Sequence, residues 1–328
     1  MAQKSKPIRV YDEEKLKLIN PETMKLWKKY QIDMELRELS PKTISGYLND
    51  LQQWWIYIYD NQENRCVTDL SEDDITDFLY YCKTQGNNSR RMKRRMSSIA
   101  AFYKFLRKKK IVGENPMEFI DRPKKDTDVV VQTFLTAEQV DNMRQKLNEL
   151  VESASSIHAK HSALMLRLYA FFSLSTMARV TAVSKTRWDQ IDFDGRTVND
   201  VVEKEGYIVT LYFSSEVATY LVELKQFRDV NGIIDGGFVF ASSYTGVASA
   251  IEASSLNEWC KKIGNMIDVP TLHPHDFRHS GSQLMKLAGA SIEEISELLN
   301  HSGLDVTKKH YLRADKKKLQ ASRDKYGI

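Results

Sequence analysis

Residues 271–312 read TLHPHDFRHSGSQLMKLAGASIEEISELLNHSGLDVTKKHYL, and they hold five of the seven histidines of the chain. A first helix is predicted from about Pro274 to Ala288, because Gly289 is a strong signal for a helix C-terminus. Ser291 is expected to cap a second helix, and Glu294, three residues later, completes a capping box. The stretch therefore predicts two short helices with polar, reactive side chains at their ends.

Four of these side chains suit chemistry on a phosphate. Arg278 is permanently charged and planar, and its guanidinium can grip two phosphate oxygens. His275, one helical turn earlier, can donate to the same group or move a proton near neutral pH. Beyond the second helix come His301 and Tyr311. A tyrosine hydroxyl, with an ordinary pKa of about 10, can attack phosphorus if cations stabilise the phenolate. The pattern indicates an anion clamp with a nucleophile supplied from the C-terminal side.

The ordered set of His-Asp-Phe-Arg-His at 275–279, Leu-Leu-Asn-His at 298–301 and Tyr311 resembles the signature of the tyrosine recombinases, or phage integrase family. In that family the pattern is roughly H-x-x-R-H, L-G-H and a nucleophilic tyrosine. The resemblance implies cleavage and rejoining of duplex DNA through a 3′-phosphotyrosine bond. It assigns catalytic roles to His275, Arg278, His301 and Tyr311. Tyr311 lies ten positions after His301, where the family pattern has nine, and His310 beside it is unusual.

Arg179 is the single charge in Ser-Thr-Met-Ala-Arg-Val-Thr-Ala-Val at 175–183. By itself, such an arginine can simply pair with a buried acid. The family has approximately T-G-L-R-I-S-E-L here, so the resemblance gives Arg179 the role of a second catalytic arginine. Met177 stands at the usual glycine and Ala182 at the usual glutamate, and we expect the missing acid to be one that orients its neighbours.

Lys204 lies at a turn between two runs with strand character, 198–202 and 207–213. A lysine at a turn is usually only solvated. The family carries its catalytic lysine in a β-hairpin at this place, so the resemblance implies that Lys204 is the general acid.

A basic segment spans residues 89–110. An apolar stripe with helical spacing predicts a buried face, made of Met92, Met96, Ile99, Tyr103 and Leu106. The candidate DNA-binding residues cluster at its start and are Arg90, Arg91, Lys93, Arg94 and Arg95. A solvated basic face explains such a cluster equally well in isolation. Contact with DNA phosphates is favoured because the four helices expected over 22–110 resemble the small core-binding domain of the same recombinases.

The predicted fold class is mainly α, with an N-terminal helical core-binding (SAM-like) bundle and a C-terminal mixed α/β catalytic domain that contains a small antiparallel sheet. The expected divisions are an N-terminal arm at 1–20, the bundle at 21–120, a linker at 121–134 and the catalytic domain at 135–328. Capping residues predict helix starts after Asn20, Ser40, Ser71 and Thr136. We also expect Ile32 to be an apolar contact and residues 238–240 to form a buried strand.

Composition excludes several classes of protein. The 328 residues, 42% hydrophobic and 28% charged, suit an ordinary folded chain of two domains. A stretch of about 18 apolar residues is lacking, which argues against a membrane span. The first residues lack an apolar signal core, and Cys66, Cys82 and Cys260 form no C-x-x-C pair, so a cytoplasmic location with reduced thiols is expected. A P-loop and H-E-x-x-H are absent from the sequence, and we expect no cofactor and no catalytic metal.

Several alternatives stay open. A type IB topoisomerase would share the nucleophile and the cations. A catalytically inactive DNA-binding accessory protein would keep the basic helix, and a zinc protein would use His273, His275 and His279. His158 and His161 form a further pair, for which a core or solvated role is favoured over a metal site. Tyr326 is a second candidate nucleophile.

The resemblance also implies partners. These are duplex DNA with specific recombination sites and a homotetramer formed on DNA through the C-terminal tail. The absence of an additional arm-binding domain indicates the simple Cre-like or Xer-like type, and the degenerate motifs favour a mobile element.

Overall fold

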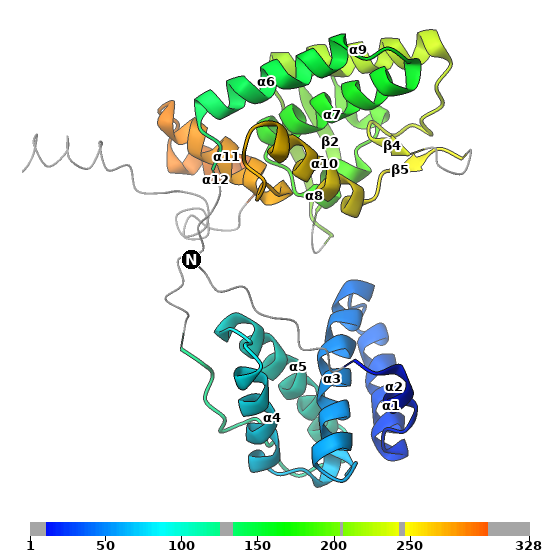
Figure 1. Cartoon of the computed structure of the whole chain (residues 1–328), viewed down its shortest axis with the longest axis vertical. Helices are drawn as coiled ribbons and strands as arrows, with labels where there is room; N and C mark the ends of the chain where they lie inside the picture. Colours follow the sequence, from blue (N-terminus) through cyan, green and yellow to red (C-terminus); the bar gives the residue numbers. More distant parts are fainter. Residues whose placement is uncertain (1–10, 125–133, 204–205, 243–246, 301–328) are drawn as a thin grey trace, which may run out of the picture. The chain divides into compact units, whose positions relative to one another are not determined.

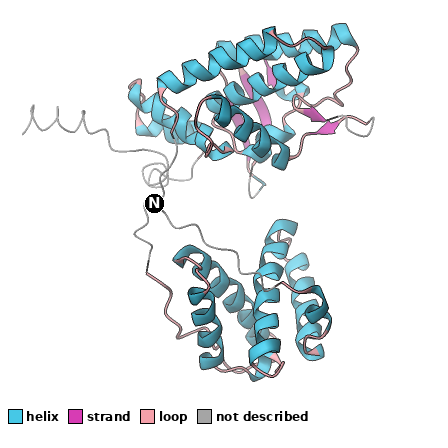
Figure 2. Cartoon of the chain, in the orientation of Figure 1, coloured by secondary structure: helices cyan, strands magenta, loops and turns pink. Residues whose placement is uncertain are grey.

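The computed structural model describes residues 11–124, 134–203, 206–242 and 247–300, in two units, 1–131 and 132–328 (Figure 1). Helices dominate both units, and the second adds two small antiparallel sheets (Figure 2). The predicted fold class, mainly α with a small antiparallel sheet in the C-terminal domain, is confirmed. Three predicted site residues, Lys204, His301 and Tyr311, lie outside the described residues.

The first unit is a helical bundle. Its elements are α1 (Glu13–Lys17), α2 (Pro21–Leu36), α3 (Pro41–Asn61), η1 (Val67–Asp69), α4 (Glu72–Thr84) and α5 (Ser89–Lys108). Asn20, Ser40 and Ser71 cap α2, α3 and α4 with their side-chain oxygens, as the sequence predicts. Each cap satisfies backbone N–H groups that have no partner within the helix.

Residues 11–20 belong to this bundle and do not form a loose arm. Asp12 caps α1, and Lys15 makes an ion pair with Asp60 at the end of α3, with 2.6 Å between Nζ and Oδ1. Ile19 is buried in the core of the unit. Ile32 was predicted to be a buried apolar contact, and this prediction is wrong. Its side chain lies on the outer side of α2 and is 57% exposed.

Large aromatic side chains fill the core of the first unit. Trp54 and Trp55 on α3, Tyr30 on α2 and Phe102 on α5 are all fully buried. The stripe predicted for α5 is confirmed, because its five members are between 0% and 6% exposed. The α5 helix is therefore held by one apolar face, which leaves Arg90 and Arg94 exposed to solvent.

The second unit contains helices and two small sheets. Its elements are α6 (Ala137–Glu152), α7 (Ile157–Thr176), α8 (Val180–Lys185), η2 (Trp188–Gln190), β1 (Ile191–Asp192), β2 (Thr197–Val202), β3 (Ile208–Tyr212), α9 (Ser215–Asn231), β4 (Ala241–Ser242), β5 (Ser249–Ala250), α10 (Ala253–Met266), α11 (Pro274–Leu287) and α12 (Ile292–Leu298). Capping boxes start α6 at Thr136 and α12 at Ser291, as predicted. The order β1-β2-β3 is antiparallel throughout.

The strand expected over 238–240 does not form. Phe238 makes an isolated bridge with Arg187, and the β4 strand begins only at Ala241. Val239 and Phe240 are nevertheless fully buried. The apolar run was thus a correct signal of burial but not of strand pairing, because a short buried segment can also pack as irregular chain.

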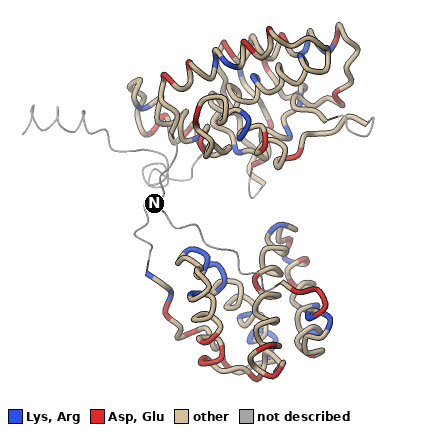
Figure 3. The backbone as a smooth tube through the Cα atoms, in the orientation of Figure 1, with Lys and Arg blue, Asp and Glu red and all other residues tan. Residues whose placement is uncertain are grey.

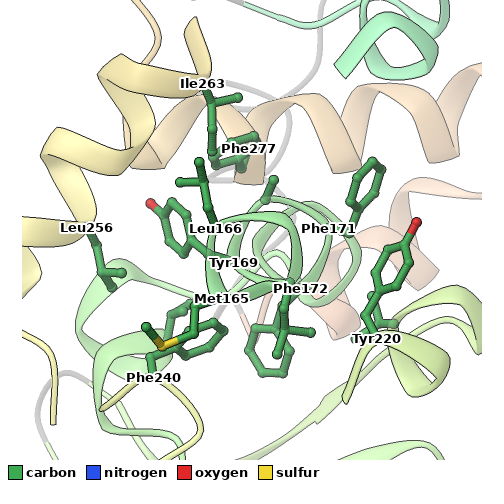
Figure 4. Packing of buried hydrophobic residues seen from close by; sticks show 14 of the residues in the cluster. Met165, Leu166, Tyr169, Phe171, Phe172, Tyr220, Phe240, Leu256, Ile263 and Phe277 are labelled. Atoms are coloured by element: carbon green, nitrogen blue, oxygen red, sulfur yellow. The ribbon is translucent and has the colours of Figure 1, made fainter. Parts of the chain in front are cut away.

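Helix α7 is the centre of the second unit. From Ala163 to Ser173 every residue is buried, so this helix is covered by protein on all sides. Figure 4 shows it end-on, with Phe277, Tyr220 and Phe240 packed around it from other parts of the chain. Its last turn ends at Met177, whose φ of 52° is left-handed, and the chain then turns directly into α8.

Helix α11 crosses the end of α7 at very short range, and Gly281 permits it. A Cβ atom at this position would lie 2.4 Å from the carbonyl oxygen of Leu174 and 2.7 Å from Cγ of Met177. Since real Cβ atoms do not approach a backbone oxygen so closely, any larger residue would push the helices apart. This crossing sets the first turn of α11 beside the α7–α8 turn, where the candidate site lies.

Candidate active site

The first turn of α11 carries His275 and Arg278, and its geometry is fixed by a capping arrangement. Pro274 occupies the first helical position, and the backbone N–H of His273 donates to Oδ2 of Asp276 over 3.0 Å. Burial raises the pKa of Asp276 to about 6, although this backbone N–H and the His273 charge act against the rise. The two candidate catalytic side chains therefore project from a well-anchored helix start.

Arg278 connects three segments that are far apart in the sequence. Its side chain is 1% exposed. Nη1 donates to the carbonyl oxygen of Met177 and Nη2 to that of Leu299, each over 2.6 Å. These are short, charge-assisted hydrogen bonds. The guanidinium thus ties the α7–α8 turn and the end of α12 to α11, and the residue that follows Leu299 and Asn300 in the chain is His301.

Arg179 is the N-cap residue of α8 and lies two residues after Met177. Its side chain is 30% exposed, and Nη1 forms an ion pair with Oε2 of Glu203 at the end of β2. Glu203 was not singled out from the sequence. Two features of the sequence could have drawn attention to Glu203. It stands directly before Lys204, and the acid usual in the family is missing at Ala182.

The starts of α8 and α11 lie beside each other, because Nη1 of Arg278 donates to the carbonyl oxygen of Met177, two residues before Arg179. His275 lies one helical turn before Arg278 on α11. The pKa of His275 is lowered, first by burial and then by the positive charges of His273, Arg278 and Arg179. The imidazole is therefore neutral at neutral pH, which is the form that accepts a proton.

The basic residues of α5 behave differently from one another. Arg91 and Arg94 both make ion pairs with Asp50 of α3, at 3.2 and 3.0 Å, and Asp50 is fully buried. Arg90 and Arg94 are exposed, whereas Arg91 and Lys93 are half-buried. Figure 3 marks the basic positions in blue along the trace. Asp50, which was not predicted, holds two of the arginines in defined orientations.

Arg95 does not belong with the surface residues. Its side chain is 1% exposed, with Nη2 donating to Oε1 of Gln53 over 2.6 Å and Nε to Oδ1 of Asn87 over 3.2 Å. A guanidinium held inside the bundle by two side-chain amides cannot at the same time contact a phosphate outside. We therefore remove Arg95 from the DNA-binding set.

The histidines offer little to a metal. His273 and His275 have ring centroids 6.4 Å apart at nearly perpendicular planes. His161 is engaged elsewhere, since its Nε2 accepts from Nε of Arg228, and burial lowers its pKa to about 4. In the parts of the chain that the structure describes, no three His, Cys, Asp or Glu side chains are grouped to hold a metal ion. Within the same ranges, no helix has the length and apolar character needed to cross a bilayer.

Comparison with known proteins gives consistent matches over both units. Residues 133–318 match the phage integrase family, and residues 28–110 match the phage integrase N-terminal SAM-like domain. A tyrosine recombinase XerC of Pediococcus pentosaceus is 26% identical, with 93% of this chain and 97% of that protein covered. A tyrosine recombinase XerD of Oceanobacillus iheyensis is 25% identical, with 83% and 87% covered.

Two solved structures share the fold. The XerH site-specific recombinase bound to a palindromic difH substrate, in a post-cleavage complex, has a TM-score of 0.71 at 15% identity, over 89% of this chain and 82% of that one. The Tn1549 transposon integrase in complex with transposon right end DNA has a TM-score of 0.62 at 17% identity, over 93% and 99%.

Proposed function

The chain belongs to the phage integrase family and is a site-specific tyrosine recombinase, and from this premise we propose that it cuts and rejoins duplex DNA through a covalent bond between Tyr311 and a 3′-phosphate. The observation that carries the proposal is the hydrogen bond from Arg278 to the carbonyl of Met177, which sets the start of α11, with His275 and Arg278, beside the turn that leads to Arg179. Two cations can stabilise the charge of a pentacovalent phosphorus, and a neutral imidazole can accept the phenol proton.

The chemistry is a transesterification with a balanced transfer of protons. The phenol oxygen of Tyr311 attacks phosphorus and gives its proton to His275, the general base. The bond from phosphorus to the 5′-oxygen breaks, and Lys204 protonates the departing oxygen. Arg179, Arg278 and His301 stabilise the negative charge on the non-bridging oxygens. The covalent ester keeps the energy of the original bond, so rejoining needs no nucleotide cofactor.

Arg278 is buried, and its hydrogen bonds to two backbone carbonyls set its position before DNA arrives. Unlike Arg95, it is proposed to bind a phosphate, and for that it exchanges one of these carbonyl oxygens for a phosphate oxygen. Preorganised charge of this kind avoids the reorganisation that water would require, and removal of one such group commonly costs about 10²–10³ in rate. The same guanidinium stabilises the end of α12 immediately before His301 in the sequence.

We propose that the start of α5 contacts DNA phosphates through Arg90, Arg91, Lys93 and Arg94. Asp50 restrains Arg91 and Arg94, which lowers the entropy that these long side chains lose on binding. Each phosphate that they neutralise releases counterions, so the affinity is expected to fall steeply as salt rises. Contacts of this kind position the protein and do not select a base sequence.

The proposed assembly is a homotetramer on two duplexes, since exchange of two double strands requires four cleavages. The 17 residues after Tyr311 are proposed to pack on a neighbouring protomer. We also propose that the recombinase serves a mobile element, which the departures from the family motif at Met177 and Ala182 favour. If so, the protein recombines sites that flank its own gene, and a cloned segment with both flanks provides the test.

Covalent trapping tests the central claim. Sheared genomic DNA is incubated with the full chain, protein-linked fragments are recovered, and their sequence gives a cleavage site. A duplex with that site and a nick just beyond it then traps the intermediate. The parent and a Tyr326→Phe control are expected to form the adduct, whereas Tyr311→Phe is expected to form none.

An adduct that persists in Tyr311→Phe would remove this nucleophile from the mechanism. Two further outcomes separate the alternatives. Relaxation of supercoiled plasmid by single protomers without strand exchange would identify topoisomerase-like activity. Binding without any adduct would identify an inactive accessory protein.

A further inference from the structure

The ion pair between Arg179 and Glu203 is built from a buried carboxylate. The side chain of Glu203 is 3% exposed, against 30% for Arg179. Its backbone is fixed as well, because Glu203 N–H donates to the carbonyl of Tyr207 over 2.8 Å and its own carbonyl accepts from Gly206 over 3.2 Å. A buried carboxylate with a defined backbone is a rigid partner for a flexible arginine.

The motif around Arg179 lacks the acid that the family carries three residues later. Ala182 stands there and is buried, at 4% exposure, without a charged group. In the described residues the acid that pairs with Arg179 comes instead from the end of β2, more than twenty positions further along the chain. The negative charge is therefore retained at the site, although it is supplied by a different element.

We propose that Glu203 is a positioning residue for Arg179, which replaces the acid absent at Ala182 and holds the guanidinium towards the site shared with His275 and Arg278. This inference rests on the function proposed above. An arginine side chain has four rotatable bonds, and an error of about 1 Å in a group that stabilises the transition state can cost about 10² in rate. A fixed carboxylate removes most of that freedom before DNA binds.

The charge of Glu203 gives the proposal a distinctive consequence. The carboxylate lies near the place where an anionic phosphate must bind, so it opposes DNA binding while it orients the arginine. Loss of the charge should therefore leave DNA affinity equal or tighter and still slow the cleavage step. A merely structural residue would lose affinity and rate together as the fold weakened.

The test measures single-turnover cleavage and DNA affinity of the full chain on the nicked duplex obtained by covalent trapping. Glu203→Gln is expected to cleave about 10–10² times more slowly than the parent, with affinity unchanged or improved. Asp200→Asn is the matched control, an exposed carboxylate of the same strand at a left-handed φ that asparagine tolerates. It is expected to cleave within about twofold of the parent.

A double-mutant cycle decides whether Glu203 acts through Arg179. In an Arg179→Ala background, Glu203→Gln is expected to change the rate by no more than about twofold, because the side chain that Glu203 positions is then absent. Equal losses in both backgrounds would overturn the proposal, and so would a Glu203→Gln variant as fast as the parent. If Glu203→Gln does not fold, Glu203→Asp keeps the charge but shortens its reach, and a parental rate there overturns the proposal.

Failure of the proposed function looks different from failure of this inference. If the parent forms no adduct that depends on Tyr311, the recombinase mechanism fails and the comparison of Glu203 variants has no basis. If the parent forms the adduct and Glu203→Gln does so at the same rate, only the positioning role is refuted.

Discussion

Arg278 and Arg179 should differ sharply in what they do for stability, although both are proposed to bind the same phosphate. Arg278 is buried and donates to two carbonyl oxygens over 2.6 Å each. In Arg278→Lys a single ammonium replaces the planar fork and can reach one of these oxygens but not both. A hydrogen bond to a charged group contributes about 1.5–3 kcal/mol, so a loss of that size is expected.

The loss should be visible as a lower unfolding temperature of the second unit. For a domain of this size, 1 kcal/mol corresponds to about 2–4 °C, so Arg278→Lys should unfold about 3–12 °C earlier in scanning calorimetry. Arg179→Lys is the matched control, because its ammonium can keep the ion pair with the buried carboxylate of Glu203, so little change in unfolding temperature is expected. Both variants should lose about 10²–10³ in cleavage rate.

The two readouts separate structure from catalysis. An Arg278→Lys variant that unfolds at the parental temperature would contradict the role given to its hydrogen bonds. A variant of either arginine that cleaves at the parental rate would contradict its place on the phosphate.

Further predictions concern protonation and charge. The cleavage rate should rise with pH and reach its plateau before pH 6.5, because the lowered pKa of His275 keeps the imidazole a neutral base. In a pH–rate profile, His275→Gln should lose this rise, and a rise that persists would contradict the assignment. Unfolding free energy should fall by at most about 3 kcal/mol as pH drops from 6.5 to about 4, since folded His161 resists the proton that the unfolded chain accepts. Urea titrations of His161→Gln should show a flatter dependence, and an unchanged slope would exclude this ring as the cause. Arg94→Met should lower the salt slope of DNA binding by about 1, whereas Arg95→Met should keep the slope and lose about 1–3 kcal/mol of stability. A reduced slope in Arg95→Met would return that residue to the DNA surface.

Local signals in the sequence predicted most helix starts. The capping boxes at Thr136 and Ser291 and the caps at Ser40 and Ser71 each begin a helix in the structure. These signals are reliable because a cap acts on N–H groups within three residues of itself, so tertiary contacts hardly alter it. The strand expected over 238–240 failed because strand pairing depends on a partner that the segment itself does not specify.

Arg95 illustrates a signal that was present but was outweighed. The buried stripe of α5 includes Met92, Met96 and Ile99, and position 95 lies between them on the same face of a 3.6-residue helix. The run of neighbouring positive charges suggested a surface instead. Periodicity was the better guide, because Gln53 and Asn87 supply the hydrogen bonds that allow a guanidinium to be buried.

Pairings between distant segments could not be read from the sequence at all. Glu203 lies 24 positions after Arg179, and Asp50 lies more than forty positions before the arginines that it holds. No local rule connects such residues, since their contact depends on how helices and strands pack. The motif did indicate that an acid was missing, but only the fold reveals where its replacement comes from.

The departure at Met177 has a physical explanation in the same packing. A left-handed φ of 52° costs a residue with a side chain roughly 1–2 kcal/mol, and glycine avoids this cost. Met177, however, is 1% exposed and forms a small cluster with Ile295 and Leu299 of the α12 region. Burial of a methionine stabilises by about 1.5–3 kcal/mol, which offsets the strain. The side chain fixes α12 against the turn while its carbonyl accepts from Arg278, so one strained residue holds both sides of the site together.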